Sequence, residues 1–488
     1  MGTPDARVGA VDQRVVVVGG GIAGLVAARE LAAAGRTVLL LEGSPTVGGK
    51  LRRGEVAGIT LDVGAEAIVN RRPEGVALAR ELGIGLVRPS AATSRIWTRG
   101  ALRPLPRTLM GAPLDLAQLA DSGVLGDEGL RAARREPELA ATTLTEAETD
   151  LSVGDLVDRR YGPEVTDRLV EPLLGGVYAG RAREISVRAA IPSLLDLAER
   201  GSITAQAGGV PPSAAGSIFT GIPGGMWRLP VELGRALVAT GRVEIRTGAM
   251  ATGLRRTADG FEVTVRTAGD ERLETADEVV LATPAAPTAR LLATVAPAAS
   301  GELARVEYAS TAVVTFAFHA DDPGVRAALD VGASGFLVPP VDGRRIKAAT
   351  FSFAKWDWVR AGGATPEGDL LVLRTSVGRI GEEETLQVPD EELVAASLAD
   401  LAEATGLSAE PVDARVQRWG GGLPQYAVGH LDRVARIRAG VAAVPGLAVC
   451  GAAYDGVGIP AVIASAQRAA AELVAGSCAG DTGDSPEG

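Results

Sequence analysis

Three glycines near the amino terminus have the spacing of a dinucleotide-binding loop. Gly19, Gly21 and Gly24 form the pattern GxGxxG directly after the β-branched run at residues 15–18. Glycine at these places allows a tight turn, close approach of the backbone to a pyrophosphate, and close packing of a helix on a strand. The start of the following helix offers free N–H groups and a positive dipole end to the phosphates. We therefore expect six residues to contact a dinucleotide: Gly19, Gly20, Gly21, Ile22, Ala23 and Gly24.

An acidic residue follows the loop at the distance that ribose recognition requires. Glu42 lies 18 residues after Gly24 and directly follows a predicted strand at residues 37–41. A carboxylate there favours a free ribose 2′-hydroxyl over a 2′-phosphate. We expect Glu42 and its neighbour Gly43 to contact the cofactor. These residues alone do not separate FAD from NAD.

The elements that must position these residues form a βαβ unit. Alanine and leucine recur at helical spacing over residues 22–34, and Gly35 is placed to end that helix. The apolar runs on either side are typical of strands that are buried on both faces. The sequence therefore predicts a doubly wound α/β domain.

The remainder of the chain is predicted to mix helices and strands. Residues 114–148 and 152–177 are rich in helix-forming residues, whereas residues 208–225 are dense in Gly, Pro and Ser and predict a loop. Six further runs predict strands, at residues 243–247, 261–267, 278–282, 311–318, 370–375 and 416–419. The polar residues 476–488 predict a disordered tail.

Composition excludes several classes of protein. The 488 residues are too many for one compact core, so two or three substructures are expected. A net charge of −11 and only 3% aromatic residues argue against a nucleic-acid partner. Two cysteines do not form a disulfide framework, and Cys450 lies in an apolar run that is typical of a core. Two histidines and two scattered cysteines also predict no metal site.

The sequence gives no sign of a membrane span. No stretch reaches the roughly 18 apolar residues that a spanning helix needs. The amino terminus shows no apolar signal-peptide core. We therefore expect a cytoplasmic protein without a transmembrane segment, and peripheral membrane contact stays open.

The residues after Glu42 resemble the flavin amine oxidase superfamily. Gly48-Gly49-Lys50 and Asp62-Val63-Gly64-Ala65 stand where that superfamily lines the FAD phosphates and the flavin. The resemblance implies FAD, with contacts from Gly49 and Lys50. It implies an α/β fold like that of flavin monoamine oxidases: a Rossmann-like FAD-binding domain, a discontinuous α+β substrate domain and a helical insertion. The expected boundaries are 12–88, 222–300 and 415–475 for the FAD-binding domain, 89–221 for the largely helical region, and 301–414 for the substrate-binding sheet domain.

Four segments narrow the resemblance to the porphyrinogen oxidases. They are GAEAIVNRRPEG from Gly64, SRIWTRGALRPLP from Ser94, LPQYAVGHLDRV from Leu423 and GAAYDGVGIPAVIASAQRAA from Gly451. The P-Q-Y-x-x-G-H pattern in the third is the most specific. By position, the resemblance implies FAD contacts from Gly64, Ala65, Glu66, Ala67, Met250, Trp419, Gln425, Val457, Gly458 and Ile459.

The same resemblance implies the reaction. A porphyrinogen loses six electrons to the flavin in three cycles, dioxygen reoxidises the flavin to give hydrogen peroxide, and no side chain is an obligatory base. Arg72 and Arg95 are the expected ligands of substrate propionates, because a guanidinium matches a carboxylate. His430, in the third segment, is expected to be structural. A chain without an anchor favours the coproporphyrinogen III enzyme of haem biosynthesis, with a coproporphyrin ferrochelatase as a transient partner.

Other functions stay open at this point. Within the porphyrinogen oxidases the alternative is protoporphyrinogen IX oxidation. Within the superfamily it is an amine oxidase or a carotenoid desaturase, although the few aromatic residues make an aromatic amine-binding cage harder to build. Outside enzymes, the alternative is a binding protein like the GDP-dissociation inhibitors. Such a protein has no need of the segment from Gly451 that resembles the flavin-closing segment of the oxidases.

Overall fold

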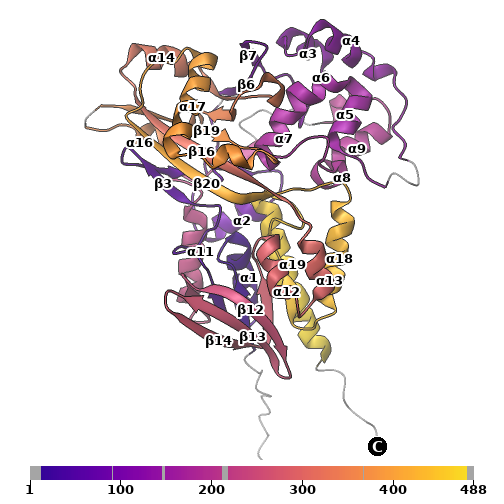
Figure 1. Ribbon diagram of the computed structural model, residues 1–488, viewed down its shortest axis with the longest axis vertical. Helices are drawn as coiled ribbons and strands as arrows, with labels where there is room; N and C mark the ends of the chain where they lie inside the picture. The colour runs from indigo at the N-terminus through magenta and orange to yellow at the C-terminus, as the bar shows by residue number, and fades with distance from the viewer. Residues whose placement is uncertain (1–12, 91, 145–148, 211–217, 367, 481–488) are drawn as a thin grey trace, which may run out of the picture.

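The computed structural model describes residues 13–480 except 91, 145–148, 211–217 and 367. Figure 1 shows two halves along the long axis of the molecule. One half is built on a parallel sheet and includes both ends of the described chain. The other half contains a large mixed sheet beside a group of helices.

The first half is organised by a five-stranded parallel sheet in the order β11-β2-β1-β15-β21. Its central strands are nearly all Val and Leu, and these side chains are buried on both faces, as expected for a sheet covered on both sides. The strands come from widely separated segments: β1 (Arg14–Val18), β2 (Thr37–Leu41), β11 (Val243–Arg246), β15 (Glu278–Leu281) and β21 (Leu447–Val449).

Helices and a three-stranded meander cover the two faces of this sheet. On one face lie α1 (Ile22–Ala33), α2 (Glu74–Glu81), α11 (Arg228–Ala239) and α19 (Ile459–Gly480). On the other lie the meander β12 (Met250–Thr257), β13 (Gly260–Thr267) and β14 (Asp270–Ala276), with α12 (Ala285–Leu292), α13 (Pro297–Leu303) and α18 (His430–Ala442). Cys450 is fully buried in the first of these cores, as predicted, and burial raises the pKa of its thiol to about 12.

The second half is organised by a seven-stranded sheet in the order β20-β16-β19-β18-β17-β6-β7. Its strands are β6 (Thr93–Thr98), β7 (Ala101–Pro104), β16 (Tyr308–His319), β17 (Ala333–Leu337), β18 (Ile346–Thr350), β19 (Leu370–Val377) and β20 (Asp413–Pro424). An apolar core joins its outer face to α14 (Pro323–Leu329) and α17 (Asp390–Thr405). The short helices α15 (Ser352–Lys355) and α16 (Asp357–Gly362) follow β18.

The helical region packs beside this sheet (Figure 1). Its core is held at one end by a buried ion pair, Arg160 to Glu136, at 2.5 Å. The helices are α3 (Leu116–Ser122), α4 (Asp127–Ala133), α5 (Val153–Tyr161), α6 (Pro163–Val165), α7 (Glu171–Tyr178), α8 (Val187–Ala190) and α9 (Pro192–Glu199). Short strands complete the chain: β3 (Arg53–Val56), β4 (Ile59–Asp62), β5 (Ile68–Val69), β8 (Thr108–Leu109), β9 (Ala112–Pro113) and β10 (Phe219–Thr220).

The structure confirms the predicted βαβ unit and the central strands. Three of the expected region boundaries differ from those in the structure. Strands β6 and β7 belong to the seven-stranded sheet, not to the helical region at 89–221. Strand β20 pairs with β16, so the segment from residue 415 does not begin in the parallel-sheet half. Residues 476–480 continue α19, which corrects the expectation of a disordered tail there. The rest of that predicted tail lies outside the described residues.

The close approach of α1 to the preceding loop gives a stability prediction. A Cβ at Gly24 would lie 1.8 Å from the Gly19 carbonyl oxygen, which is a severe clash with backbone. Gly24→Ala should therefore destabilise the protein by about 3 kcal/mol or more in urea unfolding followed by circular dichroism. In Gly234→Ala, on α11, the new methyl meets only ordinary contacts at 3.6 Å. That control should stabilise by up to about 1 kcal/mol. Equal effects of the two changes would contradict this packing argument.

Candidate functional site

The glycine loop lies at the carboxyl ends of β1 and β2. Gly21 caps α1 without a side-chain hydrogen bond, and the first turn of the helix has no acidic residue. A Cβ at Gly21 would meet nothing within 4 Å, so the protein leaves open space there. The open space, the exposed helix N–H groups and the position at the carboxyl end of a parallel sheet fit a pyrophosphate.

Glu42 is held beside this loop. Its carboxylate accepts hydrogen bonds from the backbone N–H groups of Gly20, at 2.7 Å, and Ser44, at 2.7 Å. These bonds fix the acid at the end of β2, where a ribose hydroxyl would be recognised. Met250 packs on the adjoining Gly43, where a Cβ would lie 2.6 Å from the Met250 methyl carbon. The Met250 side chain is 54% exposed, and an exposed thioether in this place fits the predicted adenine contact.

A second loop lies directly against the glycine loop. The N–H of Gly48 donates to the Gly20 carbonyl at 2.8 Å. A Cβ at Gly49 would lie 3.3 Å from the Cα of Gly21. Lys50 follows; it is half-buried, and burial lowers the pKa of its ammonium. The structure therefore brings the predicted residues Gly49 and Lys50 to the phosphate loop.

Segment 64–67 is held by a buried cluster of charges. Glu66 forms ion pairs with Arg374 of β19, at 2.9 Å, and with Lys355 at the end of α15. Burial alone would raise the pKa of Glu66, but Arg374 and Lys355 together hold it at about 2. Arg374 also donates to the Gly64 carbonyl at 2.9 Å. The segment that is predicted to contact the flavin is thus fixed to the seven-stranded sheet.

Two more contacts hold the same segment. The Asp62 carboxylate accepts from the N–H groups of Met226, at 2.7 Å, and Trp227, at 2.9 Å, just before α11. Burial outweighs these bonds and raises the pKa of Asp62 to about 7. The Trp419 indole N–H donates to the Val63 carbonyl at 3.0 Å, which brings the predicted residue Trp419 to this segment.

The carboxyl-terminal residues of the predicted site divide into two groups. Val457, Gly458 and Ile459 lead into α19, whose first turn packs in the same core as Ile22. Gln425 lies elsewhere: its amide nitrogen donates to the carbonyl of Tyr178, at 2.8 Å, and to that of Leu423, at 3.0 Å. Gln425 therefore joins the end of β20 to the end of α7, and its predicted contact with FAD is not supported by this geometry.

A cavity of about 120 Å³ lies beside the charge cluster. Its lining includes Lys355, which also binds Glu66, and residues of β6, β17 and β18: Ser94, Ser334, Leu337, Ala348 and Thr350. Small-molecule sites usually measure about 300–1,000 Å³. This cavity can therefore hold only one part of a larger ligand, next to the segment that is predicted to contact the flavin.

The two arginines predicted for substrate do not line this cavity. Arg72 is exposed and pairs with Glu74 at 2.7 Å. Arg95 follows Ser94 on β6; because side chains alternate along a strand, it lies on the face opposite to the cavity-lining Ser94. Their contacts with propionate groups stay a prediction.

The sequence analysis missed Arg374 and Lys355, which the fold brings to Glu66 from about 300 positions away. One signal was available. Lys50, Lys347 and Lys355 are the chain's three lysines, although Lys and Arg together number 49. Arginine therefore supplies nearly all of the positive charge, and each lysine is buried or half-buried.

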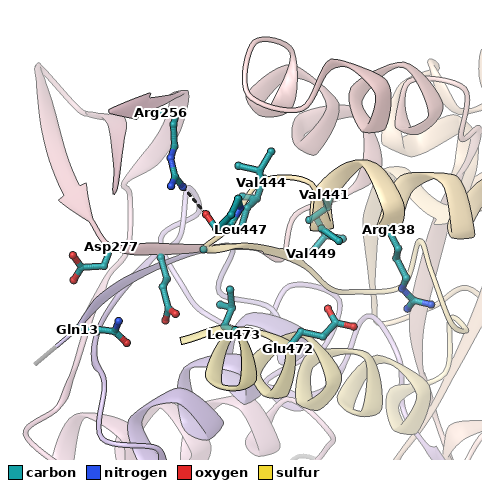
Figure 2. Close-up of a pocket in the computed structure, with 15 residues that line it drawn as sticks. Gln13, Arg256, Asp277, Arg438, Val441, Val444, Leu447, Val449, Glu472 and Leu473 are labelled. Atoms are coloured by element: carbon teal, nitrogen blue, oxygen red, sulfur yellow. Dashed lines mark hydrogen bonds between the residues drawn. The ribbon is translucent and has the colours of Figure 1, made fainter. Parts of the chain in front are cut away.

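A larger cavity of about 590 Å³ lies away from these residues (Figure 2). It is lined by Gln13, Asp277 and Leu447, which stand at the amino ends of parallel strands, and by side chains of α18 and α19 such as Val441 and Glu472. Ligands of open parallel sheets bind at the carboxyl ends. The cavity in Figure 2 is therefore not the dinucleotide site.

His430 is buried and stacks on Tyr426, with ring centroids 4.0 Å apart. Neither imidazole nitrogen has a hydrogen-bond partner within the described structure. Burial lowers the pKa of His430 to about 4, so the ring is neutral near pH 7. This environment supports the predicted structural role.

No described helix is long and apolar enough to cross a bilayer. Within the described ranges, no three His, Cys, Asp or Glu side chains are grouped in a way that could hold a metal ion.

Comparison with known proteins identifies relatives across nearly the whole chain. The family model described as flavin containing amine oxidoreductase matches residues 22–474. Coproporphyrinogen III oxidase of Mycobacterium tuberculosis is 38% identical over 468 residues, which cover 94% of this chain and 96% of that protein. The Bacillus subtilis protein of the same name is 28% identical and covers 95% and 98%. Protoporphyrinogen oxidase of Macaca fascicularis is 31% identical and covers 94% and 98%.

Solved structures show the same fold. A structure from an Exiguobacterium species, named provisionally as a protoporphyrinogen oxidase, has a TM-score of 0.83 at 30% identity and covers 96% of this chain and 100% of that chain. Cyclohexylamine oxidase of Brevibacterium oxydans has a TM-score of 0.68 at 16% identity, with 95% and 99% covered. The second likeness shows the fold alone.

The open space at Gly21 gives a cofactor-binding prediction. Gly21→Ala should leave the unfolding of the apoprotein within about 1 kcal/mol of wild type, because the methyl meets no protein atom within 4 Å and the residue has an ordinary φ of −70°. The same methyl should exclude a pyrophosphate and lower flavin content at least about tenfold. Flavin absorbance per polypeptide measures this, and full flavin content in the variant would contradict the assignment of the loop.

The buried imidazole gives a pH prediction. The pKa of His430 is about 4 in the folded protein, below its ordinary value of 6.5, so between these values only the unfolded chain binds the proton. This residue should therefore lower the free energy of unfolding as pH falls from about 7 to about 5. His430→Phe should remove that part of the pH dependence. Urea unfolding at several pH values tests it; a difference between variant and wild type that stays constant over this range would be the opposing result.

Proposed function

Because the chain belongs to the flavin-containing amine oxidoreductase family, we propose that it oxidises coproporphyrinogen III to coproporphyrin III with FAD as cofactor. The observation that carries the proposal is 38% identity over 94% of the chain with a coproporphyrinogen III oxidase. The glycine loop with Glu42 supplies a site for the dinucleotide part of the cofactor. Identity is lower, at 31%, with the protoporphyrinogen oxidase, which makes protoporphyrinogen IX the second candidate substrate.

The residues present fit FAD. The loop at Gly21 leaves room for the pyrophosphate, Glu42 is placed for the ribose, and Met250 lies where adenine is expected. Segment 64–67 and Trp419 are held together for the flavin end. When bound, the flavin supplies the acceptor for two electrons at a time, so the six-electron oxidation needs three rounds.

The protein's own side chains position the reactants and do not transfer the proton. Glu66 is ionised, since the pKa is held at about 2, and both of its cationic partners are engaged with it. It therefore holds the segment in place and is a poor proton acceptor. His430 is fully buried, and burial lowers its pKa to about 4, so the ring is neutral near pH 7. We infer that the pyrrole proton leaves to solvent, which requires no base from this chain.

The rest of the pathway is part of the same proposal. Dioxygen is the terminal oxidant, and each round yields one hydrogen peroxide, three for each porphyrin. The product, coproporphyrin III, passes to a coproporphyrin ferrochelatase that contacts this protein transiently. Both steps belong to a cytoplasmic route to haem. The named relatives support the substrate; oxidant, partner and compartment rest on the chemistry and the sequence alone.

The discriminating measurement compares the two porphyrinogens. Each is mixed anaerobically with the holoenzyme, and air is then admitted while porphyrin fluorescence and peroxide are followed. Coproporphyrinogen III should bleach the flavin and then give porphyrin and peroxide at one to three. The value of kcat/KM should exceed that for protoporphyrinogen IX by at least about tenfold, or about 1.4 kcal/mol. A preference for protoporphyrinogen IX selects the second candidate. If neither porphyrinogen bleaches the flavin, both candidate functions are refuted.

A further inference from the structure

Two buried cations lie on the seven-stranded sheet outside the site described above. Lys347 of β18 is only 5% exposed. Arg379, two residues after the end of β19, has a side chain that is 8% exposed. Burial, together with the positive charge of Arg379, lowers the pKa of the Lys347 ammonium to about 7. The two groups are therefore close enough to repel each other.

The backbone places this pair beside the small cavity. Leu337 and Ala348 pair across β17 and β18, and both line the cavity. Val338 directly follows Leu337, and Lys347 directly precedes Ala348, so these two residues face each other across the strands. The Val338 N–H donates to the Lys347 carbonyl at 2.8 Å. The Val338 carbonyl accepts from Arg379 at 3.3 Å. The cations thus lie one residue beyond the lining of a cavity that Lys355 also lines.

The acids near the pair do not bind both cations closely. Glu382 attracts Lys347, but Lys347 makes no hydrogen bond or ion pair in the described part of the chain. Arg379 pairs only loosely with Glu382, at 3.7 Å, and that acid is 36% exposed. The Glu171 carboxylate accepts from the Ala182 N–H at 2.9 Å, and burial raises its pKa. Buried cations without a partner are unfavourable, and a carboxylate that binds both would remove the imbalance.

There is room beside the helix that covers this place. Helix α7 packs against β17 and β18. Gly175 of α7 is buried, yet a Cβ there would meet nothing within 4 Å. Helix α7 therefore leaves unfilled space beside Gly175, and Glu171 of the same helix acts on the charge of Arg379.

We propose that Lys347 and Arg379 together bind one carboxylate of the substrate. The inference rests on the proposed function, which makes that carboxylate a propionate of coproporphyrinogen III. Arginine offers a planar fork to the two oxygens, and the ammonium adds a second cation. A tetrapyrrole with one edge in the cavity beside segment 64–67 extends a propionate to this pair. A vinyl group in the same place leaves both cations unpaired, so the pair selects for four propionates over two.

Binding of the product and its ester tests the pair. Holoenzyme is titrated with coproporphyrin III and with its tetramethyl ester, which has nearly the same shape but no charge. Lys347→Met should raise the Kd of the tetra-acid by about 10- to 100-fold, the loss expected for one charged hydrogen bond. The Kd of the ester should stay unchanged. Arg235→Gln, which removes a cation whose side chain is 72% exposed on α11, should change neither value.

The outcomes separate this inference from the proposed function. Equal Kd values of wild type and Lys347→Met for the tetra-acid overturn the pair as a carboxylate site. So does equal weakening of acid and ester, which indicates a packing defect. Wild-type oxidation of coproporphyrinogen III, measured on the same preparation, shows whether the proposed function stands on its own. Wild type that binds neither porphyrin overturns the pair as a carboxylate site, and the proposed function is also refuted only if the same preparation does not oxidise coproporphyrinogen III. Melting temperature and flavin content verify folding, and Lys347→Gln replaces the Met variant if that one does not fold.

Discussion

The ion pairs of Glu66 with Arg374 and Lys355 connect the two halves of the molecule. Glu66 follows the strand that ends at Asp62, whereas its partners come from the seven-stranded sheet and α15. Removing one partner from a buried ion pair leaves an unpaired charge and costs about 3–5 kcal/mol. The arrangement is therefore fixed, and with it the position of segment 64–67 relative to the cavity. We propose that this cluster, together with the contacts of Asp62 and Trp419, positions the flavin end of the cofactor against substrate.

The proposed site for the dinucleotide part of the cofactor depends on a different constraint, which is the close contact between the backbone of the glycine loop and the backbone of α1. Helix α1 crosses the glycine loop so closely that no side chain fits at Gly24. The parallel sheet that supports this contact takes strands from residues near both ends of the chain and from its middle. The cofactor-binding half therefore cannot form from one contiguous segment. Folding must bring distant segments together, which is expected to make it slow.

Local patterns in the sequence predicted four of the five strands of the parallel sheet; the short strand β21 was not predicted. Apolar and β-branched runs predicted the four strands, and the glycine spacing predicted the loop, because these features depend on neighbours within about 30 residues. The resemblance to flavin oxidases supplied the cofactor. What the sequence did not reveal depends on strand register. The shift between Ile346 and Ala348 in β18, and the alternation that turns Arg95 away from Ser94, decide which cations approach the cavity. The hydrogen bond of Gln425 to Tyr178, about 250 residues away in the sequence, was not predicted for a similar reason, and the contact of Gln425 with FAD stays a prediction.

Under the proposed function, each round of oxidation releases hydrogen peroxide beside the protein. Sulfur is the atom in proteins that such a by-product damages first, and damage proceeds through the ionised thiolate. Cys450 is enclosed in the apolar core, and its pKa of about 12 leaves almost no thiolate at neutral pH. Burial therefore shields this cysteine from oxidation by peroxide, whereas Met250, beside the glycine loop, is 54% exposed as a residue.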